Sequence, residues 1–227
     1  MCGRYYISDE DAAEDLLRII GEAVLNGMSP GNGAEPRALK TGGEVFPSDY
    51  VPVCEEGEGG ACRALGAVWG LPINGTNQLV INARAETAAG KPMFQRARPC
   101  IVPATHYFEW EVLRVERPVQ LAFDGFEIPL PERVEKRKRS IRPVYKNFSN
   151  KDLSNKDFFY MAGLVRHLPN MLPDFTIITV PAAFSIESIH DRMPSILSHE
   201  RAMEWLAMRK FNHEFIMDSS ERELVAV

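Results

Sequence analysis

The stretch CIVPATHYFEWEVL, residues 100–113, decides the fold class more than any other part of the chain. It contains two apolar runs, Cys100–Val102 and Tyr107–Leu113, that are rich in β-branched and aromatic residues. Runs of this length and composition, bounded by residues such as Pro103, are typical of short β-strands. The stretch therefore predicts two strands joined by a short connection.

Similar runs occur on both sides of this stretch and predict further strands: Ala64–Trp69, Gln78–Ile81, Val119–Phe123, Phe158–Leu164, Phe175–Val180 and Glu223–Val227. A helix is predicted over Ser8–Leu25, where Ser8 is a suitable N-cap and apolar residues recur at helical spacing. Asn26–Pro36 reads as a loop, and Ser198 caps a late helix. These elements predict an α+β fold with a single domain around a curved, barrel-like, mostly antiparallel β-sheet and a few flanking helices.

Residues 124–157 form a polar segment that we interpret as a surface insertion within a single domain spanning residues 1–227. Its basic run within Glu132–Arg139 either contacts phosphates or forms a solvated surface loop. Two runs remain candidates for the strand that follows Trp110, namely Arg117–Val119 and Arg142–Tyr145.

The composition, 45% hydrophobic and 25% charged over 227 residues, is that of an ordinary globular protein. A net charge of −5 argues against a general salt-driven coat for nucleic acid, but it allows a local basic groove. The four cysteines lack CxxC spacing, which fits free thiols and predicts a cytoplasmic protein. No apolar run reaches the roughly 20 residues of a membrane span. The five histidines show no metal-ligand spacing, so we expect no metal and no cofactor.

Cys2 follows the initiator Met1. Removal of Met1 would leave Cys2 with a free α-amine and a thiol on adjacent carbons. This 1,2-aminothiol condenses with an aldehyde to an imine and then closes to a thiazolidine. The α-amine has a reference pKa near 8, so roughly a tenth of it is neutral at pH 7. Taken alone, Cys2 could equally be an ordinary cysteine.

Three islands concentrate polar and aromatic residues that can support such chemistry: Asn82–Thr87, Pro103–Glu111 and Ile189–Pro194. Side chains alternate along a strand, so Glu109 points away from its aromatic neighbours and can carry a raised pKa in a pocket. His190 titrates in the same range. Each residue also has a structural interpretation: Asn82 in a turn, His190 as a core or capping residue, and Glu109 in an ion pair with Arg84 or Arg192.

Six motifs occur in a fixed order along nearly the whole chain: Met1–Tyr5, Trp69–Leu71, Asn82–Thr87, Cys100–Trp110, Ala162–Leu164 and Ile189–Pro194. In this order, with a cysteine at position 2, they resemble the SOS response-associated peptidase (SRAP) family, whose members shield abasic sites in single-stranded DNA. The resemblance implies a compact α+β fold around a barrel-like sheet with a positively charged DNA channel. It also implies a partner, single-stranded DNA containing abasic sites, and we expect a monomer.

The resemblance further implies roles for individual residues. Cys2 would be the nucleophile that forms the thiazolidine, and Asn82 would orient its amine or thiol. Glu109 would shuttle protons, and His190 would help to open the deoxyribose ring and release the adduct. The DNA-binding residues would be Arg4 and Arg84, which resemble phosphate-contacting arginines.

Three features of the sequence stay open. Met1 leaves either by self-cleavage, a peptidase activity, or through the cell's methionine aminopeptidase. Thr105 and His106 stand where the family usually has a small residue and glycine. Phe94 and Trp69 are candidates for base stacking, but they equally suit a core.

The alternative functions are an N-terminal-nucleophile cysteine amidohydrolase and a non-catalytic nucleic-acid-binding β-barrel. An abasic single strand separates them, because only the predicted function leaves a denaturant-stable adduct.

Overall fold

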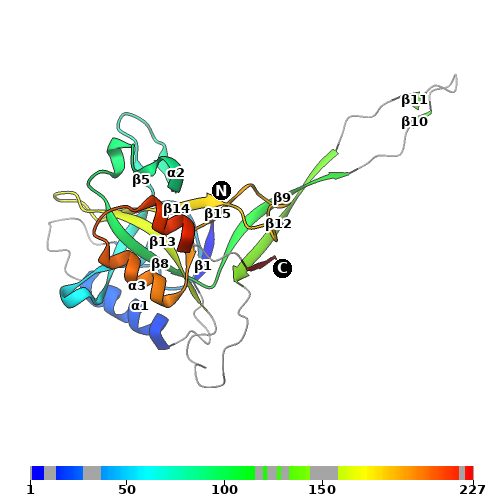
Figure 1. Cartoon of the computed structure of the whole chain (residues 1–227). Helices are drawn as coiled ribbons and strands as arrows, with labels where there is room; N and C mark the ends of the chain where they lie inside the picture. The colour runs from blue at the N-terminus through cyan, green and yellow to red at the C-terminus, as the bar shows by residue number, and fades with distance from the viewer. Residues whose placement is uncertain are drawn as a thin grey trace.

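The computed structural model describes most of the 227 residues, in the ranges 2–7, 14–27, 37–115, 120–121, 127–128, 133–143, 158–219 and 223–226. Two sheets dominate the fold, and a long hairpin projects from one of them (Figure 1).

The larger sheet has eight strands, five of which close into a ring: β3 (Tyr50–Glu56), β4 (Cys62–Trp69), β8 (Arg98–Ala104), β13 (Phe159–Arg166) and β14 (Asp174–Pro181). The ring closes because β14 pairs with both β13 and β4. Its pairing with β4 is parallel and joins only Asp174 to Val68 and Phe175 to Trp69, so the ring is not a true barrel. The sheet is completed by β7 (Asn82–Arg84), β15 (Arg192–Pro194) and β16 (Ile196–Leu197).

The ring strands are buried almost throughout, which explains their near-continuous apolar sequences. Packing is tight enough that a Cβ built on Gly163 would lie 2.8 Å from the Cys100 sulfur and 3.0 Å from the Thr176 carbonyl oxygen. Glycine is therefore required where β13 passes its neighbours.

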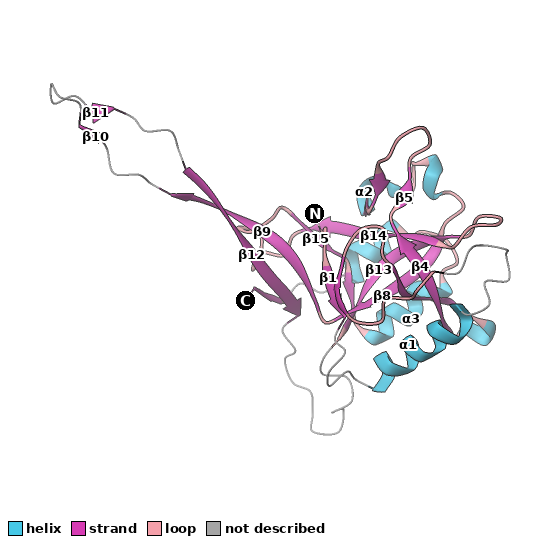
Figure 2. Cartoon of the chain, turned by 180° about the vertical axis from the view of Figure 1, so that it is seen from behind, coloured by secondary structure: helices cyan, strands magenta, loops and turns pink. Residues whose placement is uncertain are grey.

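The second sheet has five strands in the order β17 (Leu224–Ala226), β12 (Arg133–Pro143), β9 (His106–Val115), β1 (Tyr5–Ile7) and β2 (Gly43–Val45). Strands β9 and β12 pair without interruption from Tyr107–Ile141 to Val115–Arg133. We call these two paired strands the hairpin arm. Both views show the arm pointing away from the helices (Figures 1 and 2).

The helices are α1 (Glu14–Gly27), α2 (Ala85–Ala88), α3 (His199–Ala207) and α4 (His213–Ser219), and 3-10 turns occur at Glu58–Gly60 and Pro92–Phe94. Two short pairs of strands complete the structure: β5 (Leu71–Pro72) with β6 (Leu79–Val80), and β10 (Gln120–Leu121) with β11 (Glu127–Ile128). Helix α1 covers β4, where the Ala64 amide donates to Glu22 and the Asn26 amide donates to the Ala64 carbonyl. No helix in the described ranges is long and apolar enough to cross a membrane.

The predicted fold class is confirmed, as are the Ser198 cap, whose hydroxyl accepts from the Arg201 amide, and the last strand. The described part of the predicted first helix is α1, from Glu14. Residues 8–13 of that helix and residues 28–36 of the predicted loop lie outside the described residues. Asn26, expected in that loop, belongs to α1.

Two other segments differ from the sequence-based expectation. The run Gln78–Ile81 forms only the two-residue strand β6. The basic run considered as a surface loop forms most of β12, because β9 offers a complete pairing edge. Arg142 and Pro143 belong to this strand, whereas residues 117–119 and 144–157 lie outside the described part of the chain.

Candidate active site

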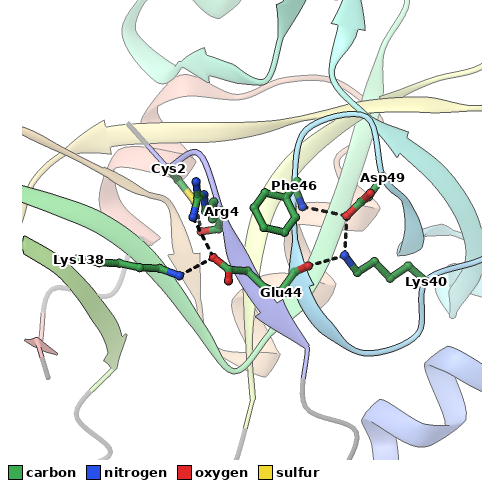
Figure 3. Close-up of polar contacts among 7 residues, drawn as sticks. All are labelled: Cys2, Arg4, Lys40, Glu44, Phe46, Asp49 and Lys138. Atoms are coloured by element: carbon green, nitrogen blue, oxygen red, sulfur yellow. Dashed lines mark hydrogen bonds and ion pairs between the residues drawn. The ribbon is translucent and has the colours of Figure 1, made fainter.

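Cys2 lies immediately before β1 and is completely buried in the core. Its thiol donates a weak hydrogen bond to the Arg4 carbonyl oxygen at 3.5 Å (Figure 3). Its own carbonyl accepts a hydrogen bond of 2.8 Å from the side-chain amide of Asn82, at the start of β7. Asn82 therefore joins the larger sheet to the N-terminal segment and fixes the position of Cys2.

Glu109 occupies the buried side of β9, as strand alternation predicts: Tyr107 and Glu109 are buried, whereas Trp110 is 44% exposed. Burial raises the pKa of the Glu109 carboxyl above its usual range. Burial, and after it the Glu109 carboxylate, raises the pKa of the Cys2 thiol. The two groups are therefore close enough to interact, and the thiol stays protonated at neutral pH.

His190 lies in the connection from β14 to β15, which closes on itself because the Ala182 amide donates to the Asp191 carbonyl at 2.9 Å. Its Nδ1 is 3.0 Å from the backbone nitrogen of Arg192 and 2.8 Å from a carboxylate oxygen of Asp191. A neutral ring accepts from the Arg192 amide, and a charged ring donates to Asp191. Burial lowers the pKa of His190, which favours the neutral form.

Asp191 connects His190 electrostatically to the Cys2 region, because its charge adds to the effect of burial in raising the pKa of Glu109. Asn82 and Glu109 thus lie beside Cys2, and His190 is linked to Glu109 through its neighbour Asp191. They come from β7, β9 and the β14–β15 connection, which are far apart in sequence.

Arg192 forms a structural clamp beside this cluster. Its guanidinium binds both carboxylate oxygens of Glu86 in α2 and the carbonyl oxygen of Thr179 in β14. Glu86, rather than Glu109, is therefore the ion-pair partner of Arg192. The sequence placed Glu86 and Arg192 in separate islands and gave no signal that they pair.

Of the two predicted DNA-binding residues, Arg84 is exposed at the end of β7 and has no ion-pair partner within the described ranges. Arg4 lies 3.4 Å from Glu44 (Figure 3). Its guanidinium sits over the rings of Phe46 and Trp110, at 4.9 and 5.9 Å from their centroids. The two arginines therefore lie on different elements and are not brought into contact.

The two aromatic candidates for base stacking belong to the core. Trp69 is fully buried and donates from its indole nitrogen to the Ile81 carbonyl at 3.0 Å. Phe94 is 5% exposed. Within the described residues, no group of three or more His, Cys, Asp or Glu side chains is arranged to hold a metal ion.

A known protein family matches almost the whole chain. The SOS response associated peptidase (SRAP) family matches residues 1–225. The chain belongs to this family.

Two curated relatives in Bacillus subtilis (strain 168) are similar to part of the chain. "Abasic site processing protein YobE" is 31% identical and "Abasic site processing protein YoaM" 30% identical, each over 144 residues and 60% of this chain. The match covers 53% and 51% of these proteins, so the chain spans about half the length of the curated relatives it matches.

Two solved structures share the fold over nearly the whole chain. A protein from Bacteroides thetaiotaomicron has a TM-score of 0.59 at 20% identity, covering 99% of this chain and 90% of its own. A phage-related protein from Bordetella bronchiseptica has a TM-score of 0.60 at 18% identity, covering 100% and 94%.

Proposed function

We propose that the protein binds single-stranded DNA and, once Met1 is removed, joins Cys2 covalently to abasic sites as a thiazolidine. The observation that carries this proposal is the hydrogen bond of Asn82 to a buried cysteine at position 2 that also interacts electrostatically with Glu109. Family membership and the names of the curated relatives support an abasic site as the substrate.

The reaction needs an aldehyde, which a closed abasic sugar supplies when its ring opens. Opening moves a proton from the C1′ hydroxyl and delivers one to the ring oxygen. His190 suits this exchange when its Nδ1 carries a proton and donates it to Asp191, because Nε2 is then free to take the proton of the C1′ hydroxyl and to return it to the ring oxygen. Burial lowers the pKa of His190, so the ring is neutral and can accept a proton at neutral pH.

The α-amine of Cys2 then adds to the aldehyde carbon and forms a carbinolamine. Loss of water gives an imine, for which an acid must protonate the departing hydroxyl. Glu109 suits this role, because burial raises its pKa and lets it retain a proton above the usual carboxyl range. Addition of the Cys2 sulfur to the imine carbon, with transfer of the thiol proton to nitrogen, closes the ring.

Asn82 has a second atom that fits the processed N-terminus. Its amide nitrogen is bound to the Cys2 carbonyl, whereas its Oδ1 is buried and accepts no hydrogen bond within the described residues. An unsatisfied buried acceptor costs about 1–3 kcal/mol. Removal of Met1 creates a new N–H donor on Cys2 itself, which matches this acceptor.

The proposal is tested by incubating the protein with single-stranded DNA that contains an abasic site and resolving the products under denaturing conditions. Wild type should give a heat-stable adduct, and Cys2→Ala should give none while retaining weak binding to the strand. Cys62→Ala is the matched control, because it removes a partly buried thiol from β4 and should leave the adduct intact.

Cys2→Ser keeps the amine but removes the sulfur, so its product should be a labile imine that borohydride traps. A heat-stable adduct with Cys2→Ala would refute the thiazolidine. Amide hydrolysis without any adduct would favour an amidohydrolase instead.

A further inference from the structure

The five-stranded sheet has two faces of different character. Register and burial place one set of side chains on the face opposite Glu109, which we call the outer face: Arg4, Tyr6, Glu44, His106, Phe108, Trp110, Val112, Val134, Lys136, Lys138 and Arg142. Phe46 extends this face beyond β2, since Arg4 lies over its ring.

Aromatic rings run along the outer face in mutual contact. Tyr6 stacks on His106 with ring centroids 4.8 Å apart, and His106 meets Phe108 edge-on at 4.9 Å. Trp110 and Phe46 remain 44% and 38% exposed. A sheet surface with exposed rings is a platform on which unpaired bases can stack.

Cations accompany the rings. Lys138 lies 3.8 Å from the centroid of the Phe108 ring, and Arg4 bridges Phe46 and Trp110. Glu44 binds both Arg4 and Lys138, as Figure 3 shows, and so neutralises only part of their charge. Lys136 lies further along the arm, is exposed and has no ion-pair partner in the described part of the chain.

The inner face of the arm differs in both respects. Its arginines stand opposite acids: the register pairs Arg137 with Glu111 and Arg139 with Glu109, and Arg139 lies 2.7 Å from Glu111. Its aromatic ring, that of Tyr107, is buried. The inner face therefore lacks both the surplus of positive charge and the accessible rings of the outer face.

We propose that the outer face, continued along the hairpin arm to Lys136, binds the nucleotides that flank the abasic site, with bases on its rings and phosphates on its lysines and arginines. The inference rests on the proposed function, because it takes the strand to be held at Cys2. Arg4 supports the continuity, since it lies two residues from Cys2 and its side chain enters this face. An unpaired strand fits better than a duplex, because stacking on protein rings requires accessible bases.

Two neighbouring residues provide a matched test. Lys136 and Arg137 are adjacent in β12, both exposed, both without an ion pair within the described residues, and directed to opposite faces. Lys136→Glu and Arg137→Glu change the net charge equally. Affinity for an intact single strand long enough to cover the arm should fall at least about fivefold more for Lys136→Glu, and its salt dependence should become shallower by at least about one phosphate contact, a slope of about 0.7.

The stacking part is tested with Phe46→Ala, which removes an exposed ring. Loss of one base-stacking contact should weaken binding about 5- to 150-fold. Leu25→Ala is the control, because Leu25 is an exposed apolar residue on α1, 72% accessible, outside the outer face.

The same variants should still crosslink a minimal abasic oligonucleotide that is too short to reach from Cys2 to the outer face. This crosslinking experiment separates the two proposals. If wild type forms no adduct, the proposed function is wrong. The outer-face proposal is instead decided by the affinities for the intact strand. Equal losses for Lys136→Glu and Arg137→Glu, a larger loss for Arg137→Glu, or unchanged binding with Lys136→Glu and Phe46→Ala would each overturn the outer-face proposal.

Discussion

The ring of strands and the hairpin arm use β-structure in opposite ways. In the ring, β13 and β14 are buried along almost their whole length, and most of their side chains are apolar. In the arm, Val112 and Val134 are 53% and 51% exposed, and the charged residues that follow Val134, Glu135 to Arg137, are exposed as well. The ring buries its side chains in the core, whereas the arm exposes its side chains to solvent.

Strand β9 belongs to the five-stranded sheet and runs from the body of the molecule into the arm, which explains where the candidate active site lies. Its first half contributes the buried Tyr107 and Glu109 beside Cys2, and its second half leaves the body as part of the arm. Reactive groups thus occupy the boundary between a rigid interior and an accessible surface. Changes on either side of this boundary should have separable effects.

The largest effect is expected at the boundary itself. Glu109→Gln and His190→Ala should slow crosslinking, release or both by about 10²–10⁴-fold, the usual contribution of a positioned acid or base. Binding to an intact single strand should change little. The measurement is the crosslinking and release rate from pH 5 to 9, and wild-type rates in both variants would make these residues structural.

A change within the ring should act on stability. Gly163→Ala would place a methyl group against the Cys100 sulfur and the Thr176 carbonyl, so overpacking should cost about 1–3 kcal/mol. For a protein of this size, that lowers Tm by about 2–4 °C per kcal/mol. Val112→Ala in the arm is the counterpart and should stay within about 0.5 kcal/mol of wild type. Equal losses of stability would remove the distinction between the two regions.

A smaller effect is expected for the two arginines predicted to bind phosphates. Arg4→Ala and Arg84→Ala should each reduce the slope of log affinity against log salt by about 0.7. Arg84 is the cleaner test, because Arg4 also contacts Glu44. An unchanged slope together with a lower Tm would assign either residue to structure.

The smallest effect concerns stability against pH. Because the pKa of Glu109 is raised in the folded protein, its contribution to stability is complete below its ordinary pKa and is lost as pH rises through the folded value. Glu109→Gln should therefore gain stability relative to wild type as pH increases above about 4.5. Urea midpoints of both proteins across pH 4 to 8 give this difference. A relative loss instead would mean that the carboxylate is stabilised by an ion pair.

Sequence patterns predicted the ring better than the arm. Two apolar runs, Ala64–Trp69 and Phe175–Val180, could be predicted as buried strands from their composition alone, and both lie within strands. β12 carries five cationic side chains between Arg133 and Arg139, and its strand character comes from pairing with β9, which composition does not reveal. β3 escaped prediction because Pro52 within it argues against a central strand.

The site divides in the same manner. Cys2, Asn82, Glu109 and His190 could be selected from residue type and motif order, and the structure places Asn82 and Glu109 beside Cys2. The atoms in contact could not be predicted, since Asn82 binds the carbonyl of Cys2, whereas the sequence indicated its amine or thiol. Nor could the partner of Arg192, which depends on α2 and β14 meeting in three dimensions.

The hydrogen bond from Asn82 holds the carbonyl group of Cys2, which takes no part in the proposed reaction, and leaves the nitrogen and sulfur of Cys2 to react. Thiazolidine formation uses the nitrogen and sulfur of Cys2, and ring opening returns them, but the carbonyl takes part in neither direction. In the proposed reaction, the contact can therefore persist unchanged while the abasic site is bound and released. Asn82 would thus hold the same atom of Cys2, its carbonyl oxygen, in the free protein and in the proposed adduct, while the nitrogen and sulfur of Cys2 bind and release the sugar.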